Sequence, residues 1–178
     1  MTRPVCVLVG PPGAGKSTVG QLLADALGVP LRDTDADIEA AAGKPISDIF
    51  VDEGEDHFRA LERAAVAAAL DDWRGVLALG GGAVLAEETR RRLRGHTVVY
   101  LSVELADAAA RCGLSGGRPL LALNPRATLK YLLDQRRPLY EEVATVTVRT
   151  DGRDPADITD EILAYLRPAA GSPSRGGA

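Results

Sequence analysis

The chain has 178 residues, of which 46% are hydrophobic and 26% charged, and its formal net charge is −4 at pH 7. These values are typical of one soluble globular domain and do not favour a nucleic acid or a membrane surface as partner. No apolar run approaches the roughly 20 residues that span a bilayer, and we expect no signal peptide, because a glycine-rich loop interrupts the N-terminal apolar run at once. The two cysteines are far apart and indicate a reducing compartment, so we expect a cytoplasmic protein, and we also expect a monomer.

The first predicted unit is a strand, a glycine-rich loop and a helix. The apolar run at 5–9 predicts a buried parallel strand, and apolar residues at helical spacing predict a helix over 16–27. Between them, residues 10–18 fit the P-loop pattern G-x-x-x-x-G-K-[ST] at every fixed position. Backbone N–H groups of such a loop and the helix N-terminus bind phosphate oxygens. We therefore predict a nucleotide phosphate site formed by Gly13, Ala14, Gly15, Lys16, Ser17 and Thr18. In this site Lys16 reaches the β- and γ-phosphates, and Ser17 holds Mg²⁺.

Strand and helix patterns alternate along the rest of the chain. Strands are predicted at 30–32, 75–79, 96–101 and 143–148. Helices are predicted at 37–42, 47–50 with Ser47 as its cap, 52–70, 87–94, 106–112, 128–140 and 155–166. This order predicts an α/β fold, a five-stranded parallel sheet with helices on both faces, in one domain over 1–167. The tail at 168–178 is rich in Pro, Gly and Ser, and we expect it to be disordered.

Three polar or glycine-rich loops follow predicted strands and should therefore share one edge of the sheet. They are the P-loop, Asp33-Thr34-Asp35 and Gly80-Gly81-Gly82. We assign Asp33 to Mg²⁺ through water, and Asp35 to accept a proton from an acceptor hydroxyl. In the alternative, Asp35 is a helix N-cap and Asp33 a turn residue. The three glycines suggest that a ligand approaches the main chain or that unusual dihedral angles are needed, and the alternative is a flexible loop.

Several arginines lie in segments from which they could bind an anionic ligand at this edge of the sheet. Arg59 lies on a predicted helix, and Arg136 and Arg137 precede Pro138. The planar guanidinium group suits carboxylate and phosphate because it forms paired hydrogen bonds. Arg118 lies in a glycine-rich break at 113–119, which resembles a hinged lid, predicted over about 113–123, that would exclude water during phosphoryl transfer.

Taken together, these segments closely resemble the shikimate kinase family. The matching pieces are 10–18, 33–35, 48–50 with 54–55 and 58–59, 79–84, 118–121 and 136–140, in the family's order. The resemblance implies a nucleoside monophosphate kinase-like P-loop fold with a mobile lid and substrate-binding helices over about 34–62. It also implies transfer of the ATP γ-phosphoryl group to the 3-hydroxyl of shikimate, a step in aromatic amino-acid biosynthesis, with Mg²⁺ as cofactor.

The resemblance also implies roles for individual residues. Asp35 would hold the shikimate hydroxyls and act as base, Arg59 and Arg136 would hold the carboxylate, and Gly81 would contact the ring. We include Gly80 and Gly82 with Gly81 in the predicted substrate site. Arg118 would approach the phosphates, and Arg111, Arg153 and Pro155 would flank adenine. The predicted strand at 75–79 lacks the usual terminal aspartate of a P-loop protein, which leaves the Mg²⁺ role to Asp33. Spacing to Pro138 favours Arg136 over Arg137 for the carboxylate.

Two other functions compete with this interpretation. A gluconate kinase would also bind a hydroxylated carboxylate, so charge alone does not exclude it, but the segments at 80–84 and 136–140 favour shikimate. A non-catalytic P-loop module is the second alternative, and the intact set of Lys16, Ser17, Asp33 and Asp35 argues against it.

Overall fold

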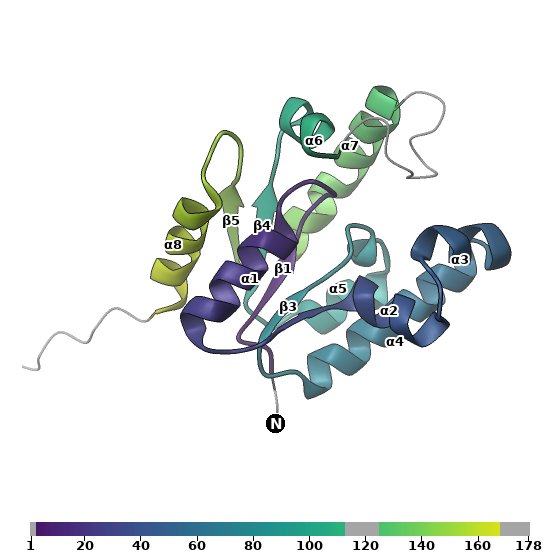
Figure 1. Cartoon of the computed structure of the whole chain (residues 1–178), viewed down its shortest axis with the longest axis horizontal. Coiled ribbons are helices and arrows are strands. Elements are labelled where there is room, and N and C mark those ends of the chain that lie inside the picture. Colours follow the sequence, from purple (N-terminus) through teal and green to yellow (C-terminus); the bar gives the residue numbers. More distant parts are fainter. Residues whose placement is uncertain (1–2, 113–124, 168–178) are drawn as a thin grey trace, which may run out of the picture.

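The computed structural model describes residues 3–112 and 125–167. Its five strands form one sheet in the order β2-β3-β1-β4-β5, and every neighbouring pair is parallel (Figure 1). The strands are β1 (Cys6–Val9), β2 (Leu31–Asp33), β3 (Val76–Ala78), β4 (Val98–Ser102) and β5 (Val146–Arg149). The predicted five-stranded parallel sheet is therefore confirmed. The predicted lid at 113–123, including Arg118, and the tail at 168–178 lie outside the described residues.

Helices pack on both faces of the sheet, as predicted. They are α1 (Lys16–Leu27), α2 (Thr34–Ala42), α3 (Ile46–Glu53), α4 (Glu55–Asp72), α5 (Glu87–Leu93), α6 (Leu105–Cys112), α7 (Pro125–Val143) and α8 (Pro155–Leu166), with a 3-10 turn η1 at Ala83–Leu85. Side chains of a strand alternate between faces, and in β1 Leu8 packs toward α1 and α8 while Val7 packs toward α4 and α5. In the described residues, no helix combines the length and apolar character needed to cross a membrane.

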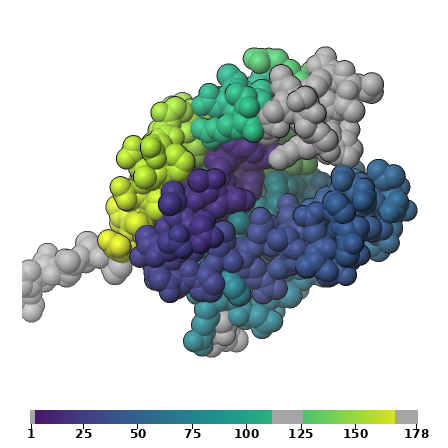
Figure 2. All heavy atoms as spheres, in the orientation of Figure 1, coloured from purple at the N-terminus to yellow at the C-terminus, as the bar shows by residue number. Residues whose placement is uncertain are grey.

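A third, smaller core joins α2, α3 and α4 beside the sheet. Ile38, Ile49 and Phe58 are its buried centre, and the ring of Phe58 lies 4.8 Å from that of Phe50. In the space-filling view α2 and α3 (blue) form a lobe on the side of the molecule opposite α8 (Figure 2). This lobe contains most of the segment predicted to bind the acceptor substrate.

Helix starts differ from the predictions where a cap was assigned to the wrong residue. Helix α2 begins at Thr34 and not at 37, because the Asp33 side chain is its N-cap and accepts a 2.9 Å hydrogen bond from the N–H of Asp35. The alternative that placed the cap at Asp35 is therefore wrong. Helix α3 begins at Ile46 after Pro45 without a side-chain cap, so Ser47 is not its cap.

Two further boundaries differ because of glycine and proline. Gly54, with φ of 88°, separates α3 from α4, so α4 begins at Glu55 rather than at 52. Helix α7 runs to Val143 with Pro138 in its interior, and β5 consequently begins at Val146 and not at 143. The helices predicted at 16–27 and 155–166 have the observed bounds.

Candidate active site

The P-loop joins the C-terminal end of β1 to the N-terminus of α1. Gly15 caps α1 with φ of 90°, a left-handed conformation that favours glycine. The Nζ atom of Lys16 donates hydrogen bonds of 2.6 Å to the Gly10 carbonyl and 3.0 Å to the Pro11 carbonyl. The lysine ammonium therefore lies over its own loop, close to where phosphate oxygens would bind.

A pocket of about 280 Å³ opens beside this loop and gathers the three predicted segments. Its lining consists of Pro12, Gly13, Gly15, Lys16, Ser17, Thr18, Asp33, Asp35, Leu79, Gly80 and Gly81. The prediction that these loops share one edge of the sheet is confirmed. Asp35 therefore faces the same space as the lysine that would bind phosphate.

Oxygen donors suitable for a hard cation also lie in this pocket. Ser17 and Asp33 both line it. The described part of the chain contains no group of three or more His, Cys, Asp or Glu residues that could hold a metal. Mg²⁺ is usually held by one or two carboxylates together with substrate phosphates and water, so this donor set fits Mg²⁺ bound with a nucleotide and does not fit an all-protein metal cage.

Asp35 is a largely buried carboxyl group with an altered acidity. Burial, together with the negative charges of Asp33 and Glu62, raises its pKa to about 6, although the nearby Lys16 ammonium opposes this rise. Its Oδ1 atom is buried and has no hydrogen-bond partner among the described residues. At pH 7 such a group is mostly ionised, yet it is basic enough to take a proton from a hydroxyl held against it.

The three glycines after β3 make room for side chains of the site. None of Gly80, Gly81 and Gly82 has a positive φ, so the need for unusual dihedral angles does not explain them. A Cβ at position 80 would collide with the Asp35 carboxylate, and one at position 82 would collide with the Arg59 guanidinium. At position 81 it would lie 3.0 Å from Pro12 and 3.5 Å from Nη1 of Arg136. A side chain at position 80 or 82 would thus have to displace a site residue, and position 81 leaves little room for one.

Two arginines reach this loop from different helices and share one buried acid. Nη1 of Arg59, on α4, donates a 2.8 Å hydrogen bond to Oε1 of Glu62, which is only 3% exposed. Arg136, on α7, is 6% exposed, and its charge also acts on Glu62, lowering a pKa that burial raises. The Nε atom of Arg136 is buried without a hydrogen-bond partner among the described residues. A buried cationic donor without a partner indicates an anionic ligand.

Glu62 was not predicted from the sequence. Its signal was the spacing, since a Glu three residues after an Arg on one predicted helix lies on the same face as that Arg.

The structure also distinguishes between the neighbouring residues Arg136 and Arg137. The positive charge of Arg137 acts on the Tyr100 hydroxyl and lowers a pKa that burial raises, whereas Nη1 of Arg136 lies 3.5 Å from the place of a Cβ at Gly81.

The residues predicted to flank adenine lie on the other side of the P-loop. Arg111, on α6, donates hydrogen bonds of 3.2 Å to the Gly13 carbonyl and 2.8 Å to the Thr150 carbonyl. Arg153 donates to the Arg149 carbonyl at 2.9 Å, and Pro155 begins α8. Arg111 therefore bridges the P-loop and the segment between β5 and α8, while Arg118 lies outside the described residues.

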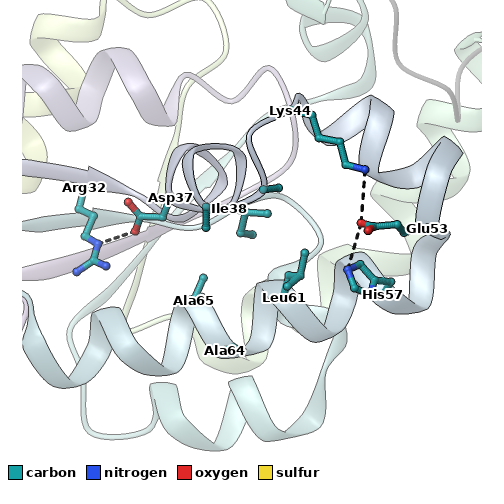
Figure 3. A pocket seen from close by; sticks show the side chains of 11 residues that line it. Arg32, Asp37, Ile38, Lys44, Glu53, His57, Leu61, Ala64 and Ala65 are labelled. Carbon is teal, nitrogen blue, oxygen red and sulfur yellow. Dashed lines mark hydrogen bonds and ion pairs between the residues drawn. The ribbon is translucent and has the colours of Figure 1, made fainter.

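A larger hollow of about 530 Å³ lies between α2, α3 and α4 (Figure 3). Its charged side chains pair with one another. Arg32 lies 2.6 Å from Asp37, and Glu53 lies 3.2 Å from His57. None of the predicted site residues is among the described residues that line this hollow. We therefore assign phosphate binding to the P-loop pocket.

Comparison with known proteins gives a consistent result along the chain. The family model for shikimate kinase matches residues 12–167. A shikimate kinase of Salinispora arenicola is 72% identical over 163 residues, which cover 92% of this chain and 98% of that protein. One of Thermobifida fusca is 59% identical over 170 residues, covering 96% and 98%. A solved structure of shikimate kinase from Acinetobacter baumannii in complex with shikimate matches with a TM-score of 0.87 and 38% identity, over 93% of both chains.

Proposed function

This chain belongs to the shikimate kinase family, and we infer that it transfers the γ-phosphoryl group of ATP to a hydroxyl group of shikimate. The observation that carries this conclusion is the family match over residues 12–167, together with 72% identity to a shikimate kinase over nearly its whole length. The chain is therefore a phosphotransferase of the shikimate pathway. Gluconate kinase and a non-catalytic nucleotide-binding module, the two competing functions, are disfavoured by the same match.

We propose that the acceptor is the 3-hydroxyl of shikimate and that Arg59 and Arg136 hold the shikimate carboxylate. The buried guanidinium of Arg136, with an Nε atom that has no partner among the described residues, supports this assignment. A carboxylate can accept two parallel hydrogen bonds from such a group. Gly80, Gly81 and Gly82 would then contact the ring, because their missing side chains leave the backbone open beside both arginines.

In the proposed reaction Asp35 orients the acceptor hydroxyl and takes its proton. The hydroxyl oxygen forms a bond to the γ-phosphorus while the bond from that phosphorus to the β–γ bridging oxygen breaks, and the hydroxyl proton passes to the Asp35 carboxylate. The products are shikimate 3-phosphate and ADP. Lys16 would stabilise the charge on the phosphates, and its position in the same pocket as Asp35 supports this pairing.

Ser17 and Asp33 would hold Mg²⁺, since their oxygen atoms line the P-loop pocket and are donors that this ion prefers. When bound, the ion neutralises part of the phosphate charge. The nucleotide base would lie near Arg111, Arg153 and Pro155, and Arg118 would supply a further cation from the lid. We also propose that the protein acts in the cytoplasm, as its cysteine usage predicts, and that it is a monomer.

A coupled assay of ADP formation tests this function. ADP release should require shikimate, and gluconate at the same concentration should give turnover at least about 100-fold lower, because a hydroxyl held out of line with the phosphate reacts far more slowly. Phosphorus NMR of the product should show one phosphate ester on the ring. Equal turnover of the two acids, or ATP hydrolysis that shikimate does not stimulate, would overturn the proposal.

A further inference from the structure

Tyr140 is not among the residues that line the P-loop pocket, but it contacts one of them. It lies on α7 one helical turn after Arg136 and is 1% exposed. Its hydroxyl donates a 2.5 Å hydrogen bond to the carbonyl oxygen of Gly81. Its ring stacks on that of Tyr100, with centroids 5.1 Å apart and planes tilted by 24°. The ring is therefore held on one side by β4 while its hydroxyl reaches the loop after β3.

The hydrogen bond from Tyr140 completes the set that fixes the three glycine carbonyls. The Gly80 carbonyl accepts from the N–H of Ala83, and the Gly82 carbonyl accepts from the N–H of Leu85, both at 3.1 Å. These two bonds are local, whereas the bond to the Gly81 carbonyl comes from a helix 59 residues later in the chain. Because all three carbonyls have donors, the alternative of a flexible loop is not supported.

Fixing one carbonyl also fixes the neighbouring donor. A trans peptide is planar, so the direction of the Gly81 carbonyl determines that of the Gly82 N–H, which points to the opposite side of the same peptide. If the hydroxyl of Tyr140 were absent, this peptide would lose its only tertiary hydrogen bond among the described residues and could rotate. The position of Tyr140 therefore controls which groups the loop presents.

The same hydroxyl lies close enough to Arg136 for the guanidinium charge to act on it, and Nη1 of Arg136 lies 3.5 Å from the place of a Cβ at Gly81. A tyrosine hydroxyl can donate one hydrogen bond and accept others, so it can donate to the carbonyl while accepting from the guanidinium. Burial raises the pKa of Tyr140, which keeps this donor protonated at neutral pH. One atom thus joins the loop and the cation.

We propose that Tyr140 is a positioning residue for the acid substrate, whose hydroxyl fixes the Gly81 peptide and the Arg136 guanidinium in one relative placement. This inference rests on the proposed function, because it is there that Arg136 is assigned to the shikimate carboxylate. Tyr140 itself does not touch the reacting atoms. Its contribution should therefore appear in the affinity for shikimate and not in the affinity for nucleotide.

Tyr140→Phe is the direct test, since it keeps the ring and its packing on Tyr100 and removes only the hydroxyl. The dissociation constant for shikimate, measured by calorimetry, should rise about tenfold, the effect of losing one buried hydrogen bond. The dissociation constant for ATP should stay within about twofold of the wild-type value, because no contact of Tyr140 reaches the P-loop lysine. Tyr100→Phe is the matched control: it removes the hydroxyl of the stacked neighbouring ring, on which the charge of Arg137 acts, and shikimate affinity should remain unchanged.

Hydrogen exchange in the substrate-free protein gives a second readout that needs no shikimate chemistry. Amides of the segment 80–85 should exchange faster in Tyr140→Phe than in the wild type or in Tyr100→Phe. Wild-type shikimate affinity in Tyr140→Phe, equal losses for both ligands, or unchanged exchange of 80–85 would each overturn the proposal. A wild-type enzyme that does not phosphorylate shikimate would instead refute the proposed function, and the exchange experiment would still report on the loop.

Discussion

The carboxylate of Asp35 lies directly against the backbone of Gly80, so that a Cβ at position 80 would be 2.9 Å from the Asp35 Cγ atom. Real Cβ atoms do not approach other heavy atoms this closely, so any side chain at position 80 must displace the acid. The contact joins the end of β3 to the start of α2. It therefore sets the distance between the proposed base and the P-loop.

Gly80→Ala should lower kcat about 100-fold, because moving a catalytic group by about 1 Å can have an effect of this size. Affinity for ATP should change little. Gly28→Ala is the control: it adds a methyl group in open space at a φ of 67°, so it should reduce stability by about 1 kcal/mol while leaving kcat intact. Steady-state kinetics and thermal unfolding of both variants make the comparison, and a Gly80→Ala enzyme with wild-type kcat would contradict the proposed position of Asp35.

Asp35→Asn should lose most turnover while keeping nucleotide affinity, since a general base contributes roughly 10²–10⁴-fold to a rate. The same variant should be more stable than the wild type at pH 7. The pKa of Asp35 rises from 3.8 in the unfolded chain to about 6 in the folded one, so the folded state binds more protons between these values and loses stability as pH rises through them. Ionised Asp35 therefore costs up to about 3 kcal/mol above pH 6.

Thermal unfolding at two pH values tests the stability part of this prediction. The melting temperature of Asp35→Asn should exceed that of the wild type at pH 7, and the difference should disappear as the pH falls below 3.8, where the wild-type carboxyl group becomes protonated in both states. A higher melting temperature for the wild type at pH 7 would show that Asp35 gains more from its surroundings than burial costs it.

Much of this site could be predicted because its parts are local in sequence. Lys16 follows a glycine loop between an apolar strand and an amphipathic helix, and consecutive residues of such a unit form the phosphate site. Asp33 and Gly80 each follow a strand, and parallel strands bring their carboxyl ends to one edge. These relations depend on the order of elements and not on side-chain packing.

The residues that sequence analysis missed depend on tertiary packing. Tyr140 donates a hydrogen bond to the Gly81 carbonyl, 59 residues earlier in the chain, and nothing in the local sequence of Tyr140 specifies that partner. Glu62 was detectable as a helical neighbour of Arg59, but only its 3% exposure distinguishes it from a solvated surface pair. Helix α7 was predicted over 128–140 and is longer at both ends, Pro125–Val143, with Pro138 in its interior.

Glu62→Gln should shift the acid limb of the pH–rate profile to lower pH. In the wild type, kcat should fall below about pH 6 as Asp35 becomes protonated. The negative charge of Glu62 raises the pKa of Asp35, so its removal makes ionisation easier and lowers that pKa. The variant should also bind shikimate more weakly, because Arg59 loses its 2.8 Å partner.

The control for this profile is Glu55→Gln, which removes the other acid near Arg59. Glu55 lies 3.5 Å from Nε of Arg59, and its side chain is 55% exposed, so solvent screens its charge. Its profile should match that of the wild type. An acid limb that stays in place in Glu62→Gln would mean that Glu62 does not act on the group that limits the rate.

Arg136→Lys should weaken shikimate binding by about 10- to 100-fold and leave ATP binding nearly unchanged, because lysine cannot reproduce the paired hydrogen bonds of a guanidinium group to a carboxylate. Arg137→Lys is the matched control on the next residue, since Arg137 acts on Tyr100 and is not among the side chains that approach the three glycines. Calorimetric titration of each variant with shikimate and with ATP separates the two sites. If Arg137→Lys loses shikimate affinity and Arg136→Lys does not, Arg137 holds the carboxylate. If Arg136→Lys loses affinity for shikimate and for ATP equally, Arg136 supports the fold of the whole site and does not act on one substrate.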